Sequence, residues 1–122
     1  MRIFKNAWFR RFARRERITD QVLREAIDRA EDGITDADLG GGVIKQRIAR
    51  SGQGKSGGYR TIIVFKKGDL AFFVYGYAKS ERNNIDRGET DAFKRAAIQL
   101  LALSDEQIEM LIEKGALTEI GP

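Results

Sequence analysis

Apolar and polar residues at the start of the chain follow one short strand pattern and then two helical patterns. Residues 1–5 alternate enough to predict a strand. Asn6 then offers an N-cap to a helix that runs to about Arg17, and Thr19 offers a cap to a second helix that Gly33 suitably ends. The apolar positions form one stripe on each helix, made of Trp8, Phe9, Phe12 and Ala13 on the first and of Val22, Leu23, Ala26, Ile27 and Ala30 on the second. The two helices are predicted to form a hairpin.

β-Branched and aromatic residues dominate three runs in the middle of the chain. These runs predict strands over residues 43–50, 59–66 and 70–77. Three glycines at 40–42 separate the strands from the preceding helices. The short segment 67–69 contains Gly68 and is typical of a tight hairpin, so the strands on either side of it should pair antiparallel.

A helical period returns from Thr90 and continues over one apolar face. Ser104, followed three residues later by Gln107, gives the capping-box pattern of a further short helix. The predicted order is therefore β-α-α-β-β-β-α-α. Because the chain shows no repeat and no linker, we expect one domain over residues 1–122.

Composition narrows the chemistry that this domain can carry. The chain has 122 residues, of which 42% are hydrophobic and 33% charged, which is typical of one globular domain with a core that includes Trp8. It contains no cysteine and no histidine, so disulfides, thiol nucleophiles, cysteine metal sites and the commonest acid–base group are excluded. Any catalysis is expected to use Lys, Arg, Tyr or carboxylates.

The net charge of +4 hides four blocks of alternating sign. Residues 1–17 carry a net +6, residues 18–42 a net −5, residues 43–82 a net +7 and residues 83–122 a net −4. Two concentrated basic blocks favour a polyanionic partner, with nucleic acid as the leading candidate and a solvated basic face as the plain alternative. No apolar run is long enough for a membrane span, so we expect a soluble, cytoplasmic protein with no membrane partner.

Basic residues also gather on particular faces of the predicted elements. Strand geometry places Lys45 and Arg47 together on the face opposite Ile44 and Ile48. Arg60 opens the next strand. On the first helix, Arg10, Arg14 and Arg17 follow helical spacing and form a basic ridge, which we interpret as an RNA-binding surface. Ordinary solvated charges are the alternative for each group alone.

The glycine-rich segment 52–56 ends in Gly-Lys-Ser, which invites comparison with a phosphate-binding loop. The comparison fails because Ala49 stands where the first glycine is needed and a strand follows where the motif needs a helix. A hairpin loop that carries Arg50 and Lys55 as RNA-backbone contacts is favoured, and a nucleotide site is the minor alternative.

Two segments of the chain resemble the RelE/ParE superfamily of bacterial toxin–antitoxin systems, particularly its RelE and HigB-like branch. Residues 44–47 (IKQR) and 56–60 (SGGYR) look like the family's basic strand and its Gly-Tyr-Arg strand start. Residues 72–85 look like the last core strand running into a Lys-x-Glu-Arg turn, here KSER at 79–82. The similarity covers roughly residues 1–100, followed by a helical extension over about 101–120.

The resemblance implies an α+β fold in which a helical hairpin packs on a small twisted antiparallel sheet, with the active site on the exposed concave face. Members of this branch cleave mRNA, usually in the ribosomal decoding site, by attack of a ribose 2′-OH on the adjacent phosphate. The matching positions imply that Arg60 clamps the phosphate, that Lys45 or Arg47 orients RNA and that Lys45 acts as general base. They also imply that Lys79 is a further catalytic residue and forms a second basic cluster with Arg82. Such a reaction needs cations and a proton acceptor, so no metal and no cofactor are expected.

Some features of the chain depart from the family pattern. Ser80 and Asp86 stand where some relatives have an arginine and an aromatic residue or histidine. Proton transfer is then left to Lys45, Tyr77, Glu81 or Asp86, and the sequence does not choose among these groups.

Two other functions are compatible with the sequence. The ParE branch shares the fold but poisons DNA gyrase without catalysis, and a plain nucleic-acid-binding module is a further alternative. The clustered cations of the predicted sheet favour the nuclease branch. The implied partners are mRNA, the ribosome and a cognate antitoxin, expected to be a helix-turn-helix protein encoded beside the toxin.

Overall fold

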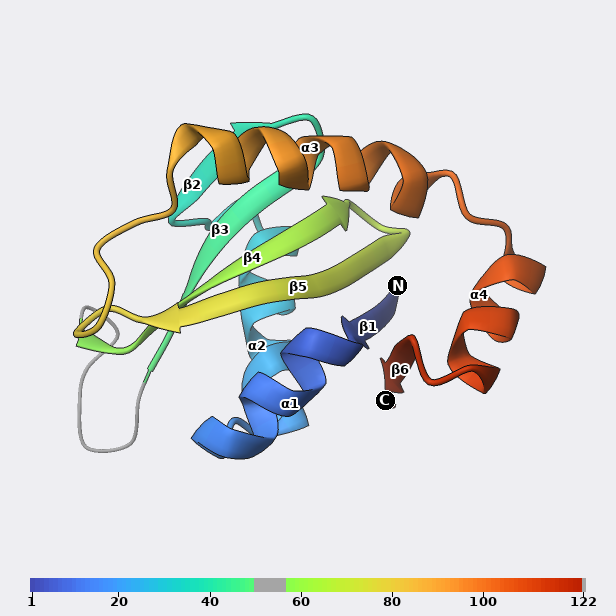
Figure 1. The fold of residues 1–122 in the computed structure, drawn as a ribbon, viewed down its shortest axis with the longest axis horizontal. Coiled ribbons are helices and arrows are strands. Elements are labelled where there is room, and N and C mark those ends of the chain that lie inside the picture. The colour runs from blue at the N-terminus through green and yellow to red at the C-terminus, as the bar shows by residue number, and fades with distance from the viewer. Residues whose placement is uncertain (50–56, 122) are drawn as a thin grey trace.

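The computed structural model describes residues 1–49 and 57–121, which form an α+β fold. Figure 1 shows the arrangement of the elements. In chain order they are β1 (Arg2–Asn6), α1 (Ala7–Glu16), α2 (Asp20–Glu31), β2 (Ala37–Gly40), β3 (Val43–Ile48), β4 (Tyr59–Lys66), β5 (Leu70–Ala78), α3 (Arg87–Leu101), α4 (Asp105–Glu113) and β6 (Leu117–Ile120).

The strands form one six-stranded sheet in the order β2-β3-β4-β5-β1-β6. All neighbouring strands are antiparallel except β1 and β5, which are parallel. The predicted hairpin between β4 and β5 is confirmed, and Gly68 adopts a φ of 75° in its turn. Of the residues of β5, only those in its first half pair with β1. Among the described residues, the second half of β5 therefore forms a free edge of the sheet beside α1.

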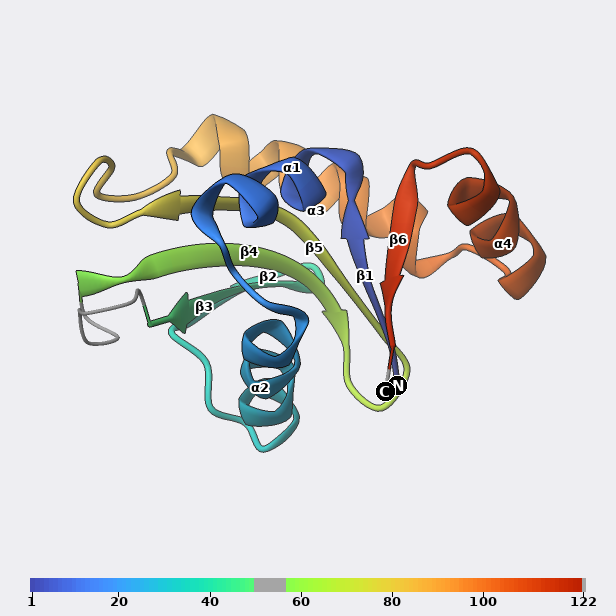
Figure 2. The same ribbon diagram turned by 90° about the horizontal axis from the view of Figure 1, so that it is seen from below.

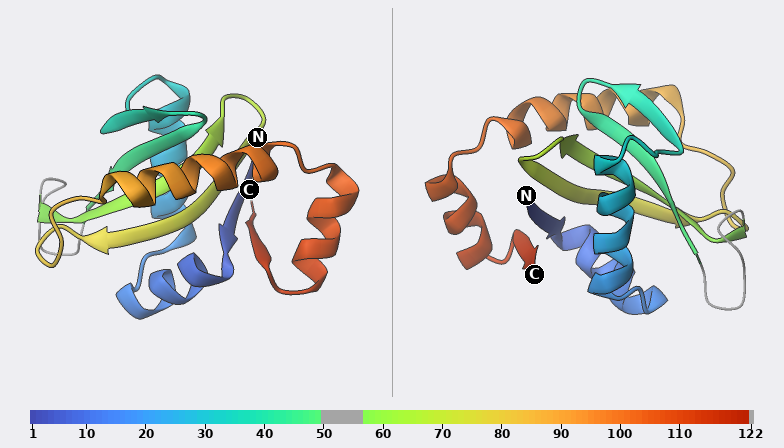
Figure 3. Two further views of the ribbon diagram at one scale, coloured as in Figure 1. Left: turned by 45° about the horizontal axis from the view of Figure 1, so that its top comes forward. Right: turned by 180° about the vertical axis from the view of Figure 1, so that it is seen from behind.

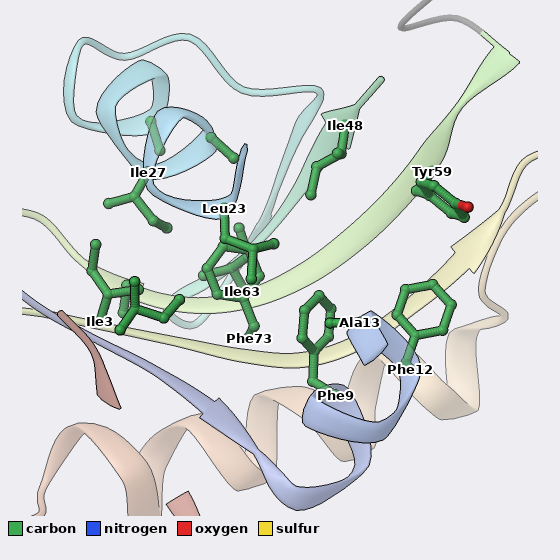
Figure 4. Close-up of a cluster of buried hydrophobic side chains, with 14 of the residues drawn as sticks. Ile3, Phe9, Phe12, Ala13, Leu23, Ile27, Ile48, Tyr59, Ile63 and Phe73 are labelled. Atoms are coloured by element: carbon green, nitrogen blue, oxygen red, sulfur yellow. The ribbon is translucent and has the colours of Figure 1, made fainter. Parts of the chain in front are cut away.

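One face of the sheet is covered by the two N-terminal helices. The predicted caps are confirmed, since the side chains of Asn6 and Thr19 accept hydrogen bonds from the backbone N–H groups of Phe9 and Val22. α1 packs on β5 and β1, and α2 packs on β3 (Figure 2). Their apolar residues meet those of the strands in a continuous core, part of which Figure 4 shows.

Trp8 does not join this core, contrary to the sequence prediction. It remains 37% exposed, whereas Phe9 and Phe12 of the same helix are buried. The indole lies at the free edge of β5, with its ring centroid 4.6 Å from that of Tyr75. The reason is geometric, because the sheet ends under the first turn of α1 and offers no further strand against which Trp8 could pack.

The opposite side of the sheet carries α3 and α4, where α3 packs on β3 and β4 and α4 packs on β6. Ala97 of α3 and Ile108 of α4 are buried in a second core with residues of β3, β4 and β5. α3 begins at Arg87, earlier than predicted, because Asp86 and Glu89 form a capping box. The loop 79–86 leads from the end of β5 to this helix (Figure 1).

Two strands were not predicted. β2 has the sequence Ala-Asp-Leu-Gly, which has low β propensity, and it pairs with β3 across a glycine turn. β6 is a four-residue strand that returns after α4 to pair with β1. Within the described residues, no helix is both long and apolar enough to cross a membrane.

Candidate functional site

The register of the sheet brings Lys45, Arg47 and Arg60, three of the predicted catalytic residues, together. Arg47 of β3 lies directly opposite Arg60 of β4, and Arg60 lies opposite Tyr77 of β5. Lys45 lies two residues from Arg47 on the same strand, and strand alternation places its side chain on the same face. Lys45, Arg47 and Arg60 therefore form one cationic cluster at the end of the sheet where β5 finishes.

Asp36, which the sequence analysis missed, lies at the centre of the cationic cluster. Its Oδ1 is 2.7 Å from Nε of Arg47, and its Oδ2 is 3.6 Å from Nζ of Lys45 and 3.5 Å from Nε of Arg60. Burial tends to raise the pKa of the Asp36 carboxyl, but the hydrogen bond from Arg47 and the charges of the three cations outweigh burial and lower it. Asp36 is thus a permanent anion at neutral pH that holds three cations in place.

The three cations differ in how far they reach toward solvent. The side chain of Arg47 is 49% exposed, whereas Arg60 as a whole is only 5% exposed. Lys45 lies between these extremes. Arg60 therefore forms the floor of the cationic cluster, and an approaching anion meets Arg47 and Lys45 first.

Tyr77 and Asn84 close the cluster on the side of β5. Nζ of Lys45 donates to Oδ1 of Asn84 at 3.3 Å, and the hydroxyl of Tyr77 lies 3.5 Å from the same oxygen. Burial raises the pKa of Tyr77, although the charges of Arg60 and Arg82 oppose this effect. The phenol therefore stays protonated at neutral pH and can act as a proton donor.

Lys79 stabilises the loop 79–86 through hydrogen bonds and does not join the cationic cluster. Its Nζ donates to both the backbone oxygen and the Oδ1 of Asn83, each at 2.9 Å. Glu81 and Asp86, the other two candidates for proton transfer, also lie outside the cationic cluster. Asp86 is the N-cap of α3 and accepts from the backbone N–H of Glu89 at 2.8 Å.

Arg82 has a larger set of partners in the same loop. It donates to the backbone oxygen of Asn84 at 2.9 Å and to the hydroxyl of Tyr75 at 3.0 Å, and it forms an ion pair with Glu89. Its guanidinium carbon lies 5.7 Å from the ring centroid of Tyr77. Arg82 thus lies over the ring of Tyr77, the residue that lies opposite Arg60 in the register of β4 and β5.

The predicted arginine ridge of α1 is exposed to solvent. Within residues 1–49 and 57–121, Arg10, Arg14 and Arg17 form no ion pair with Glu25 or Asp28 of α2. Arg17 ends α1 in the left-handed conformation with a φ of 57°. Arg50 and Lys55, the predicted loop contacts, lie outside the described residues.

The cationic cluster has the chemistry of a phosphate-binding site. Two guanidinium groups and one ammonium group converge on a single carboxylate, and a protonated phenol stands beside them. Fixed donors of this kind stabilise negative charge that develops on phosphate oxygens. In the part of the chain that the structure describes, no group of three acidic or metal-ligating side chains lies close enough to hold a metal ion.

Comparison with known proteins identifies the family of the chain. No curated protein and no solved structure shows a significant match to the chain. A family model does match, over residues 1–120, and its description is the RelE toxin of the RelE/RelB toxin–antitoxin system. Because this match spans nearly the whole chain, the protein belongs to the RelE toxin family, whose members act in toxin–antitoxin systems together with an antitoxin.

Proposed function

We propose that this RelE-family toxin is an endoribonuclease that cuts mRNA on the ribosome in the cytoplasm and so stops translation. The observation that carries the proposal is the convergence of Lys45, Arg47 and Arg60 beside Tyr77. A surface that only binds a protein does not require three cations around one carboxylate on the face of a sheet.

The reaction that suits these groups uses a nucleophile supplied by the RNA. The 2′-oxygen of one ribose bonds to the adjacent phosphorus, and the bond from phosphorus to the 5′-oxygen of the next nucleotide breaks. The products are a 2′,3′-cyclic phosphate and a 5′-hydroxyl. No metal-bound water is needed, because the attacking oxygen already lies next to the phosphorus.

The cations of the site would stabilise the extra negative charge of the transition state. We assign the phosphate clamp to Arg60, whose guanidinium forms the floor, and the first contact with the RNA to the exposed Arg47. Lys79 and Arg82 would meet the RNA backbone from the loop 79–86.

Two protons move in this reaction. Lys45, as a neutral amine, is the candidate to accept the proton of the 2′-hydroxyl, and Tyr77 is the candidate to give a proton to the leaving 5′-oxygen. Both groups contact Oδ1 of Asn84, so they are neighbours within the site. Burial raises the pKa of Tyr77, so the phenol carries its proton at neutral pH.

Induction of the protein in growing cells tests the proposal. A nuclease shortens cellular mRNAs, and the new 5′-ends carry a hydroxyl that polynucleotide kinase labels without prior phosphatase treatment. The Arg60→Ala variant should leave the mRNAs intact. Growth arrest with intact mRNA would contradict the proposal and favour a toxin that acts by binding a protein such as DNA gyrase. Relief of growth arrest by an adjacent helix-turn-helix protein would identify the antitoxin.

A further inference from the structure

A hollow of about 560 Å³ lies between α1 and the second half of β5. Its lining includes the aromatic side chains of Trp8, Phe12, Tyr75 and Tyr77, and we call it the aromatic pocket. The ring centroids of Trp8 and Tyr75 are 4.6 Å apart, and those of Tyr75 and Tyr77 are 6.1 Å apart. Trp8 is 37% exposed, whereas tryptophan is on average highly buried in folded proteins.

Arginine side chains lie over the rings of this pocket. The guanidinium carbon of Arg82 is 5.8 Å from the ring centroid of Tyr75 and 5.7 Å from that of Tyr77. That of Arg15 is 5.6 Å from the ring centroid of Phe12. Aromatic rings and guanidinium planes are the groups on which unpaired nucleobases stack, and stacking tolerates any base because every base has a π-face.

The aromatic pocket adjoins the cationic cluster through Tyr77. This residue lines the pocket and lies directly opposite Arg60 in the register of β4 and β5. Neighbouring strands are about 4.8 Å apart, so the backbones of Arg60 and Tyr77 lie side by side in the sheet. One residue of the cationic cluster is therefore the direct strand neighbour of a residue that lines the aromatic pocket.

We propose that the aromatic pocket binds one unpaired nucleobase of the RNA, next to the phosphate held by the cationic cluster. The proposal rests on the proposed RNA substrate. RNA is favoured over a protein partner because it carries planar bases and phosphates at neighbouring positions, as this surface requires. The volume is within the range of sites that enclose small planar ligands. Trp8 is then a base-binding contact and not a catalytic residue.

Trp8 is the only tryptophan of the chain, so its fluorescence reports on the pocket directly. The probe is a 2′-O-methyl oligonucleotide of mixed sequence, which lacks the attacking hydroxyl and cannot be cut. It should quench the fluorescence of the full chain in a saturable way. An oligonucleotide of equal length with abasic positions should bind through its phosphates with little quenching. Equal quenching by both probes, or none by either, would overturn the proposal.

A second measurement uses the anisotropy of the same oligonucleotide carrying a 5′-label. The Trp8→Ala variant should weaken binding by about 5- to 150-fold, the usual effect of losing one base-stacking ring. Trp8→Phe should retain most of the affinity. Ile98→Ala is the matched control, because Ile98 is 72% exposed on α3 and lies outside the aromatic pocket.

The outcomes separate this proposal from the proposed function. If the protein binds the base but does not cut unmodified mRNA, the proposed nuclease activity is contradicted and the proposed base site is supported. If the protein cuts mRNA and Trp8→Ala binds the probe with unchanged affinity, the proposed nuclease activity is supported and the proposed base site is overturned. If Trp8→Ala instead weakened only the binding of the antitoxin, the aromatic pocket would be a protein contact, and the base site would again be overturned.

Discussion

Oδ2 of Asp36 lies 3.5 Å from Nε of Arg60, so an acid placed just before the edge strand β2 holds the most deeply buried cation of the candidate site. The same carboxylate also contacts Arg47 and Lys45. The cationic cluster is therefore partly neutralised from within. Asp36 fixes the directions of the cations and at the same time weakens their attraction for RNA.

These two roles of Asp36 predict opposite effects of the Asp36→Asn variant on binding and on cleavage. RNA should bind at least as tightly, because a negative charge is removed, whereas cleavage should slow by at least tenfold because Arg60 and Arg47 lose their fixed positions. The free energy of unfolding should fall by about 1–3 kcal/mol, the usual effect of leaving charged donors without their partner. Anisotropy, single-turnover cleavage and urea unfolding measure the three quantities. Slower cleavage that comes only from weaker binding would show that Asp36 does not position the cations.

Replacement of Arg60 tests the proposed phosphate clamp. Arg60→Ala should reduce cleavage by about 10²–10³-fold and abolish growth arrest, since one fixed donor of developing charge is lost. Arg60→Lys should rescue only part of the activity because it lacks the bidentate fork. The matched control is Arg95→Ala, an exposed arginine on α3. A soluble, folded Arg60→Ala variant that still arrests growth would refute the assignment.

The exposed ridge of Arg10, Arg14 and Arg17 is predicted to bind ribosomal RNA separately from the cationic cluster. Replacing all three with Gln should weaken sedimentation with ribosomes and flatten its salt dependence, by roughly 0.7–0.9 in logarithmic slope for each lost phosphate contact. A control with Lys67, Arg95 and Lys114 changed to Gln removes the same charge from other exposed positions. Equal slopes for the two triple variants would make the ridge an ordinary solvated surface.

The ion pair between Arg82 and Glu89 predicts a pH dependence of stability. The hydrogen bond from Arg82 lowers the pKa of Glu89 from 4.5 to about 2. A carboxyl whose pKa is lowered by folding stabilises the fold at pH values above its pKa in the unfolded state. This contribution is lost as the pH falls toward the pKa of the folded state. The urea midpoints of the wild-type chain and of Glu89→Gln should differ by a constant amount above pH 4.5 and converge as pH falls toward 2. If the difference between the two urea midpoints persists at the lowest pH, the charge of Glu89 is not the cause of that difference.

Local signals in the sequence predicted much of this fold, because they act over a few residues. The caps at Asn6, Thr19 and Ser104 lie where the side-chain pattern placed them, and the strand over 59–66 has its predicted bounds. Strand alternation also predicted that Lys45 and Arg47 share a face.

Contacts between distant segments could not be predicted in this way. Asp36 joins the cationic cluster only because β2 pairs with β3, and the weak β propensity of residues 37–40 conceals that pairing. Trp8 has the helical spacing of a core residue, but the sheet ends beneath it. Both features depend on which strand lies at an edge, and this is a property of the whole sheet.

The pairing of β6 with β1 has a practical consequence for handling the protein. Ile3 lies opposite Ile120, so the two ends of the described chain emerge side by side (Figure 3). They lie near the start of β5, and Tyr77 lies seven residues further along this strand, roughly 20 Å away at about 3.3 Å per residue. An affinity tag or a fluorescent fusion at either end would therefore stand clear of the cationic cluster, and a short linker between the ends would permit a circularly permuted form.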